Sequence, residues 1–325
     1  MDRRDFIAGI TLGLLAAPLA AEAQQAGRPH KIAYLANSAE RTSVDAAFLD
    51  ALHELGYVAG ENVSIDARYT GGRSEVFARI VSEVADQRPD VILVWSTGFA
   101  RAVKNGTKGI PIVFSAANGP VENGLVQSIA RPGGNVTGTT LFGHGFVAKQ
   151  LSILRELVPA AARVALLANT TYLMSRAYTA EAIKAGPSLK ITVELMKANS
   201  PEEIEGAFLE VRKRRIQAVL VTADPMYWSI RERIMQAATQ SRVPAMYWAR
   251  EYVEAGGLIS YAANLAEIAR VGARYVAQIL KGVRPADLPV QDPTKFDLLI
   301  NLKTAKVLGL TIPPSLLQRA DQVIE

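Results

Sequence analysis

The sequence contains no cysteine, and this absence excludes several chemistries at once. A thiol nucleophile, a zinc site with cysteine ligands and a cysteine-ligated iron–sulfur cluster all need the thiolate. Only three histidines occur in 325 residues, and none has the spacing of a metal-binding motif such as HExxH. The GxSxG, P-loop and strand-linked GxGxxG motifs are also missing. We therefore expect no catalytic residue, no metal and no cofactor.

The excess of positive over negative charge is also small, since the formal net charge is only +5. The single dense basic run is Arg212-Lys213-Arg214-Arg215, and it closes a segment that opens with Pro201-Glu202-Glu203. Acidic residues at the start and basic residues at the end complement a helix dipole. The alternative is a nucleic-acid patch, which would need a longer basic stripe. We expect a solvated helix end and no nucleic-acid partner.

The N-terminus has the three parts of a secretory signal. Arg3 and Arg4 supply the charged part, and Phe6 to Leu19 form an apolar stretch that is short for a membrane span. The small-x-small pattern that ends at Ala23 predicts cleavage there. We expect residues 1–23 to be removed and the mature protein to be periplasmic. The paired arginines leave the twin-arginine and general export routes open, and an uncleaved anchor is the alternative.

The remaining chain is long enough for two domains, since one core rarely keeps growing to this size. Apolar runs of strand length alternate with helical patterns along it. This alternation is typical of βαβ units, which form parallel sheets with helices on both faces. We expect an α/β fold.

Three phrases of the first half return in the same order in the second half. KIAYLAN at Lys31 is echoed by RVALLAN at Arg163, and RPDVILVWSTG by RIQAVLVTADP. The phrase GIPIVFSA is echoed by RVPAMYWAR at nearly the same offset. Ordered echoes indicate an internal repeat. We therefore expect two Rossmann-like lobes with parallel sheets, joined by a multi-strand hinge.

The expected limits follow from three segments that could cross between the lobes: 135–145, 256–264 and 295–302. They place the N-terminal lobe at 28–138 plus about 264–294, and the C-terminal lobe at 139–263 plus about 295–325. The tail is expected to end in a short helix that reaches the terminus.

In open parallel sheets, ligands bind beyond the carboxyl ends of the strands. Two facing lobes would bring those ends together across a cleft, and two such lobes can close about a hinge. The polar and aromatic residues at these ends suit a small-molecule site. The candidate ligand-binding residues are Asn37, Ser38, Ser96, Thr97, Gly98, Ser115, Asn118, Asn169, Tyr172, Asp224, Tyr227 and Glu251.

For two of these positions, a role in ligand binding and a purely structural role are both possible from the sequence. Ser96-Thr97-Gly98 opens a predicted helix, so its hydroxyls and free backbone N–H groups could hold a carboxylate or only cap the helix. Asp224, before Pro225, could bind a ligand ammonium group or only cap the next helix.

Several phrases resemble the substrate-binding proteins of bacterial ABC importers, in the group that includes tryptophan- and tyrosine-type binders. They include FLDALHELGYVAGENVSIDARY, PVENGLVQSIARPGGNVTG, REYVEAGGLISY and the block that starts at ILKGVRPADLPVQDP. The resemblance covers nearly the whole mature chain. It implies a type I periplasmic-binding-protein fold, a small ligand in the cleft, and a membrane permease and an ATPase as partners of a monomer.

Two departures from the family pattern fall at the expected cleft. The family usually has Asp before the Pro of DPVxxGLV, where this chain has Gly119, and the loop Asn169–Ser175 differs from the usual Asn-Pro phrase. The ligand is therefore open between an aromatic or other amino acid and an aromatic acid.

The sequence thus predicts an exported solute-binding protein of an ABC importer, which is not an enzyme. An extracytoplasmic sensor with the same fold is the main alternative, since only its membrane partner would differ. An exported hydrolase would need a nucleophile and base that no motif marks. A sugar-responsive repressor, which shares the lobes, would need a helix-turn-helix at the N-terminus, where this sequence has the signal pattern instead.

Overall fold

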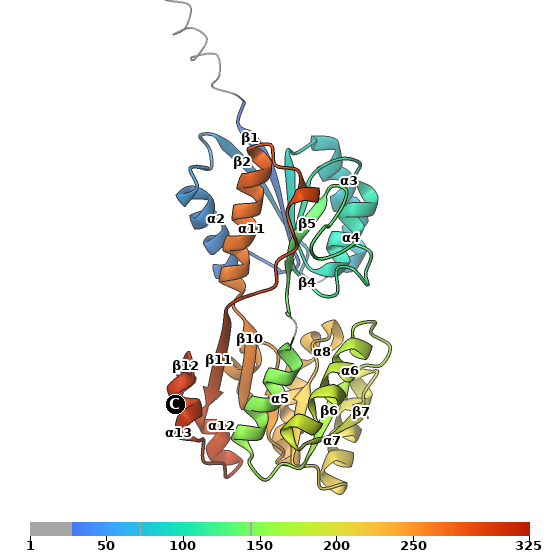
Figure 1. The fold of residues 1–325 in the computed structure, drawn as a ribbon, viewed down its shortest axis with the longest axis vertical. Coiled ribbons are helices and arrows are strands. Elements are labelled where there is room, and N and C mark those ends of the chain that lie inside the picture. The colour runs from blue at the N-terminus through green and yellow to red at the C-terminus, as the bar shows by residue number, and fades with distance from the viewer. Residues whose placement is uncertain (1–27, 72, 144) are drawn as a thin grey trace, which may run out of the picture.

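The computed structural model describes residues 28–71, 73–143 and 145–325, which form two lobes (Figure 1). The expected signal, residues 1–23, lies outside this part of the chain, so its cleavage stays a prediction. Among the described ranges, no helix has the length and apolar character needed to cross a membrane.

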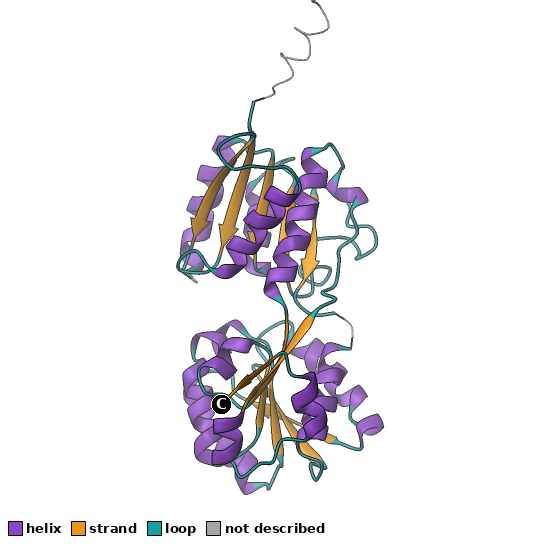
Figure 2. Ribbon diagram, turned by 90° about the vertical axis from the view of Figure 1, so that its left-hand side faces the viewer, coloured by secondary structure: helices purple, strands orange, loops and turns teal. Residues whose placement is uncertain are grey.

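The first lobe is built on a parallel five-stranded sheet with the order β2-β1-β3-β4-β5. Its strands are β1 (His30–Ala36), β2 (Val63–Tyr69), β3 (Val91–Trp95), β4 (Ile112–Ala117) and β5 (Val136–Thr140). The helical elements between them are α2 (Ser43–Glu54), η1 (Ser74–Val76), α3 (Phe77–Gln87) and α4 (Thr97–Gly106). The middle strands are continuous apolar runs because helices bury the sheet on both faces (Figure 2).

The second lobe contains a seven-stranded sheet with the order β12-β11-β10-β9-β8-β6-β7. Its strands are β6 (Arg163–Ala168), β7 (Thr192–Lys197), β8 (Ala218–Val221), β9 (Ala245–Tyr247), β10 (Ile259–Ala263), β11 (Phe296–Asn301) and β12 (Gln322–Ile324). The order from β7 to β10 repeats that from β2 to β5, which agrees with the echoed phrases. Strand β11 then pairs antiparallel with β10, and β12 pairs parallel with β11.

Helices of the second lobe cover both faces of this sheet (Figure 2). They are α5 (Phe146–Leu157), α6 (Ser175–Ala185), η2 (Pro187–Leu189), η3 (Pro201–Glu203), α7 (Ile204–Lys213), α8 (Pro225–Ser229), α9 (Arg231–Ser241), α10 (Arg250–Glu254), α12 (Leu302–Val307) and α13 (Pro314–Arg319). The expected terminal helix is wrong in one respect. It stops at Arg319, and the last residues join the sheet as β12.

The two lobes exchange one helix each. Helix α11 (Leu265–Leu280) follows β10 of the second lobe but packs on α2 and β4 of the first. Helix α5 follows β5 of the first lobe but packs on α6 and β8 of the second. Figure 1 shows the orange α11 among blue elements and the green α5 among yellow ones. Each lobe is therefore completed by a segment from the other half of the chain.

Helix α11 approaches the first sheet closely. Asn264 caps it by accepting a hydrogen bond from the Glu267 N–H at 2.9 Å. A Cβ added at Gly272 would lie 3.0 Å from both Leu93 Cδ1 and Ser115 Oγ, so the absence of a side chain allows this approach. The contact fixes the first lobe's sheet against a helix that starts at the lobe junction.

The chain crosses between the lobes three times, and the crossings bind one another. They follow β5, β10 and η4 (Pro285–Asp287). The Thr140 hydroxyl donates to Asp292 Oδ1 at 2.6 Å. The Asn264 side-chain amide donates to both carboxylate oxygens of Asp297, at 3.1 and 2.9 Å. The third crossing is thus bonded to the first, and the start of β11, into which it leads, is bonded to the second.

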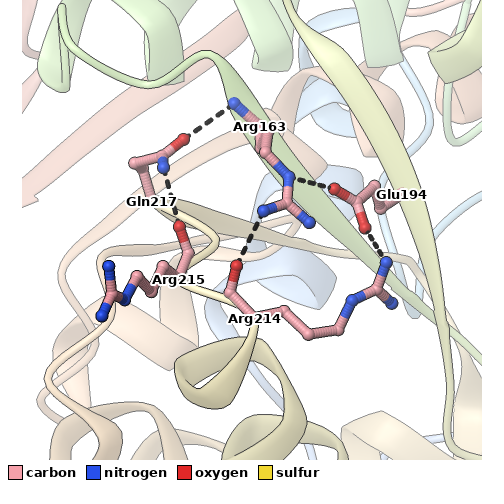
Figure 3. Close-up of polar contacts among 5 residues, drawn as sticks. All are labelled: Arg163, Glu194, Arg214, Arg215 and Gln217. Carbon is pink, nitrogen blue, oxygen red and sulfur yellow. Dashed lines mark hydrogen bonds and ion pairs between the residues drawn. The ribbon is translucent and has the colours of Figure 1, made fainter.

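The basic run lies at the C-terminal end of α7, where positive charge complements the helix dipole as expected. Part of the run also has a structural role (Figure 3). Glu194 on β7 bridges the guanidinium groups of Arg163 and Arg214. Arg163 also donates to the Arg214 carbonyl oxygen at 2.7 Å, and Gln217 accepts from the Arg163 backbone N–H at 2.8 Å. These bonds tie β6, β7 and the turn before β8 together.

We predict that Glu194→Gln lowers the free energy of unfolding at pH 7 by about 1 kcal/mol, a value kept small by solvent around the arginines. Hydrogen bonds from Arg163, aided by the charge of both arginines, hold the pKa of Glu194 below its usual value. The wild-type advantage should therefore be present at neutral pH and shrink as pH falls below about 4. Urea unfolding at pH 7 and at pH 3.5 measures it.

Glu210→Gln is the matched control, because Glu210 makes one loose contact of 3.9 Å with Lys213. It should leave stability unchanged at both pH values. A Glu194→Gln effect that is equal at the two pH values would contradict the assigned role of the carboxylate.

Candidate functional site

On the first-lobe side, Ser96 and Thr97 stand at the start of α4, at the carboxyl end of β3. Ser96 has φ +79°, and its hydroxyl oxygen accepts from the Phe99 N–H at 3.5 Å. The Thr97 hydroxyl accepts from the Asn118 N–H at 2.8 Å and donates to the Asn118 carbonyl oxygen at 3.3 Å. Both hydroxyls therefore hold the local fold, and Thr97 joins the start of α4 to the loop after β4. A ligand role for them stays a prediction.

On the second-lobe side, Asp224 is the best-buried charged candidate, with 3% of its surface exposed. Its Oδ1 accepts from the N–H groups of Met226 and Tyr227, at 2.7 and 3.1 Å, and so caps α8. Its Oδ2 is buried and receives no hydrogen bond from the described residues. Burial raises the pKa of Asp224, although the N–H groups of Tyr227 and Met226 and the nearby Asn169 side chain oppose the shift. One carboxylate oxygen is thus without a partner in the described part of the chain.

The loop after β6 places Asn169 and Tyr172 beside this carboxyl. Asn169 is buried, and its side-chain oxygen accepts from the Thr171 N–H at 3.0 Å and from the Thr171 hydroxyl at 2.6 Å. This turn carries Tyr172 toward the first lobe. Burial raises the pKa of the Tyr172 hydroxyl, and the nearby Asn118 side chain opposes that shift. Loops from both lobes therefore meet at this point.

A cavity of about 350 Å³ lies between the lobes on the side of the crossings. It is lined by the start of α2, the first and second crossings, the segment after β9 and one residue of β11. The lining residues are Ser43, Val44, Leu141, Trp248, Ala249, Arg250, Glu251, Glu254, Ala262, Ala263, Asn264, Leu265, Ala266 and Asp297. Of the predicted site residues, Glu251 is the one in this lining. Glu251 is therefore a second carboxyl at the junction, and burial raises its pKa.

Aromatic side chains form a wall on the second lobe beside this cavity. Trp248, which lines the cavity, lies 5.4 Å from Trp228 between ring centres and meets Phe142 edge-on at 6.1 Å. Phe142, on the first crossing, also meets Tyr178 edge-on at 5.8 Å. Rings of this kind offer a planar ligand both faces and edges for contact.

Other predicted site residues lie away from this junction or are used by the fold. Tyr227 is fully buried in the core of the second lobe, and its hydroxyl donates to the Ala198 carbonyl oxygen at 2.8 Å. Ser115 is fully buried beneath α11. Gly98 lines a surface groove between α3 and α4.

Asn37 and Ser38 are held by the loop after β2. The Asn37 side chain accepts from the Thr70 hydroxyl at 2.8 Å, and the Ser38 carbonyl oxygen accepts from the Gly71 N–H at 2.8 Å. The structure therefore brings together Ser96, Thr97, Asn118, Asn169, Tyr172 and Asp224, with Glu251 in the adjoining cavity.

Several residues of the junction do not stand at the carboxyl ends of strands. Phe142 lies on the first crossing, Asp297 lies at the start of β11, and Ser43 lies at a helix start several residues beyond its strand. The sequence contains one indication that Phe142 lies at the junction, because Phe142 stands in the Gly- and Thr-rich segment that is expected to cross between the lobes. Among the described residues, no group of three or more His, Cys, Asp or Glu side chains is placed to hold a metal ion.

Two similar lobes, three mutually bonded crossings and a polar, aromatic junction define a hinged two-lobed binding protein. The chain belongs to the family described as "ABC transporter substrate binding protein", whose model matches residues 33–324. The fold is that of the type I periplasmic binding proteins. It is shared with a leucine binding protein of Thermotoga maritima, which is 14% identical with a TM-score of 0.58 over 78% of this chain and 83% of that one.

Two nearer relatives are known with an aromatic amino acid, one by its name and one by its bound ligand. The chain is 26% identical over 274 residues to a "Tyrosine-binding protein" of Clostridioides difficile, covering 83% of this chain and 79% of that one. It is also similar to a Streptococcus pneumonia ABC domain solved in complex with L-Trp. That structure is 27% identical with a TM-score of 0.80, over 91% of this chain and all of that one.

We predict that Asp224→Asn keeps or raises the thermal midpoint at pH 7. Asparagine still offers an oxygen to the N–H groups of Met226 and Tyr227, while the cost of burying a charge disappears. Since the folded-state pKa of Asp224 is raised above 3.8, its ionisation costs stability as pH rises above that value. The gain of the variant over wild type should therefore grow from acid to neutral pH in thermal melts.

Asp224→Ala is the companion variant, because it removes the helix cap as well as the charge. Loss of a cap costs about 1 kcal/mol, so this variant should melt below Asp224→Asn at pH 7. Equal losses in the two variants would show that the carboxylate itself stabilises the lobe.

Proposed function

We propose that this protein is an exported solute-binding protein that captures a small amino acid ligand between its lobes and delivers it to an ABC permease and its ATPase. The observation that carries the proposal is the buried Asp224 oxygen without a hydrogen-bond partner, at the point where loops of both lobes meet. A ligand ammonium group would supply the missing donor and neutralise the buried charge.

The rest of the junction fits the other parts of an amino acid. Ser96 and Thr97, at the start of α4, would approach the ligand carboxylate together with the helix N-terminus. The wall of Trp248 and Phe142 would contact an aromatic side chain. The tyrosine and tryptophan named for the two relatives support an aromatic amino acid as the ligand.

Ligand binding and lobe closure would be coupled, because a ligand that touches both lobes favours the arrangement in which they meet. The closed form would dock on the permease as a monomer. The N-terminal signal pattern supports export to the periplasm, with cleavage after Ala23.

A thermal-shift screen of the mature protein tests this function. We expect stabilisation by one or more L-amino acids, with tyrosine and tryptophan among the first to be tried. A ligand at 100 times its Kd adds about 2.7 kcal/mol of stability. Indole-3-propionate, which resembles tryptophan without the ammonium group, should give no shift at the same concentration.

Asp224→Asn should lose the amino acid shift while keeping its own fold, which the melt without ligand reports. No shift with any amino acid, or an equal shift with the deaminated acid, would refute the proposed ligand class. Transport of the identified ligand by proteoliposomes that carry the permease and ATPase would test delivery separately.

A further inference from the structure

The lobes also touch through an apolar contact beside the polar residues of the site. Gly119 lies in the first-lobe loop after β4, and Met174 lies just before α6 of the second lobe. A Cβ added to Gly119 would lie 2.5 Å from Met174 Sδ and 2.6 Å from its Cε. The Met174 side chain therefore occupies the space that a side chain at position 119 would need.

The first-lobe half of this contact is held in place by Asn123. Its side-chain amide donates to the carbonyl oxygens of Asn118 and Gly119, each at 3.0 Å, and lies 3.7 Å from Met174 Sδ. Gly119 itself has φ +51°, a conformation that favours glycine. One side chain thus fixes the glycine backbone and also touches the sulfur that covers it.

The second-lobe half belongs to the same loop as the site. Met174 follows Tyr172 by two residues, and its side chain packs against the core of the second lobe. Tyr172 meets Asn118, the neighbour of Gly119. The contact therefore borders the polar junction directly and lies where the two lobes come together. A methionine suits such a place because its flexible thioether adapts to an irregular surface.

We infer that Met174 is a specificity-determining residue, which crosses to Gly119 and closes off one end of the ligand site. Full closure then places the flexible end of the Met174 side chain where a side chain at position 119 would lie. Met174 would limit how far a ligand near Asn118 and Asp224 can extend. This part of the inference rests on the proposed function. The closure part rests on the contact geometry alone.

Gly119→Ala tests the contact, and Gly124→Ala is its matched control. Both glycines lie in one loop with positive φ, +51° and +67°, but a Cβ at Gly124 meets no atom within 4 Å. Backbone strain is thus common to the two variants, and only Gly119→Ala adds a clash with Met174. Met174 meets the added methyl group only with the flexible end of its side chain, so the cost should fall at the low end for an overpacked contact. For the ligand found by thermal shift, Gly119→Ala should raise Kd about fivefold relative to Gly124→Ala.

Met174→Ala in the Gly119→Ala background should restore most of the affinity, because the shortened side chain leaves room for the added methyl group. Met174→Ala alone should shift preference toward larger ligands, measured as the ratio of Kd values for a ligand and a bulkier analogue. Met174→Leu, of similar size, should keep the wild-type ratio. Melts without ligand confirm that each variant is folded.

Small-angle scattering without ligand separates this inference from the proposed function. Gly119→Ala should have a larger radius of gyration than wild type and Gly124→Ala, and Met174→Ala should reverse the increase. If the wild-type protein binds no amino acid, the proposed function is refuted, but the comparison of radii of gyration still tests the inference. Equal radii in all variants, or no rescue by Met174→Ala, would overturn the inference.

Discussion

Two aspartates, Asp292 on the third crossing and Asp297 at the start of β11, bond the segments that join the lobes, and the junction is built around these bonds. Thr140 at the end of β5 donates to Asp292, and Asn264 before α11 donates to Asp297. Asp297 also lines the interlobe cavity. The residues that connect the lobes and those that line the cavity between them therefore have one member in common.

Much of the fold could be predicted because its signals are local. Continuous apolar runs such as Val91–Trp95 mark the buried strands. The echoed phrases predict the repeated strand order. The features that differ depend on distant partners. The tail is helical only as far as Arg319, after which the edge of β11 pairs with β12, and the helical segment that follows Asp224 is divided at Ile230 into α8 and α9.

The position of the candidate site was easier to predict than the residues that surround it. Parallel topology places Ser96, Asn118, Asn169 and Asp224 near one junction, as expected for residues at the carboxyl ends of strands. The position of a residue at a strand end does not tell which way its side chain faces, so Ser115 under α11 and Tyr227 in the core were also candidates. The contacts of Met174 and Phe142 are with the opposite lobe and with neighbouring aromatic rings, and no local sequence pattern encodes them.

The helix exchange between the lobes has a consequence for how the chain acquires its structure. The first sheet ends at Thr140, but the helix that covers one of its faces, α11, is synthesised only with residues 265–280. Until then the apolar face under Gly272 has no cover, so the N-terminal half cannot form a finished unit ahead of the rest. Folding must therefore join segments far apart in the chain, which makes it slower than folding through local contacts.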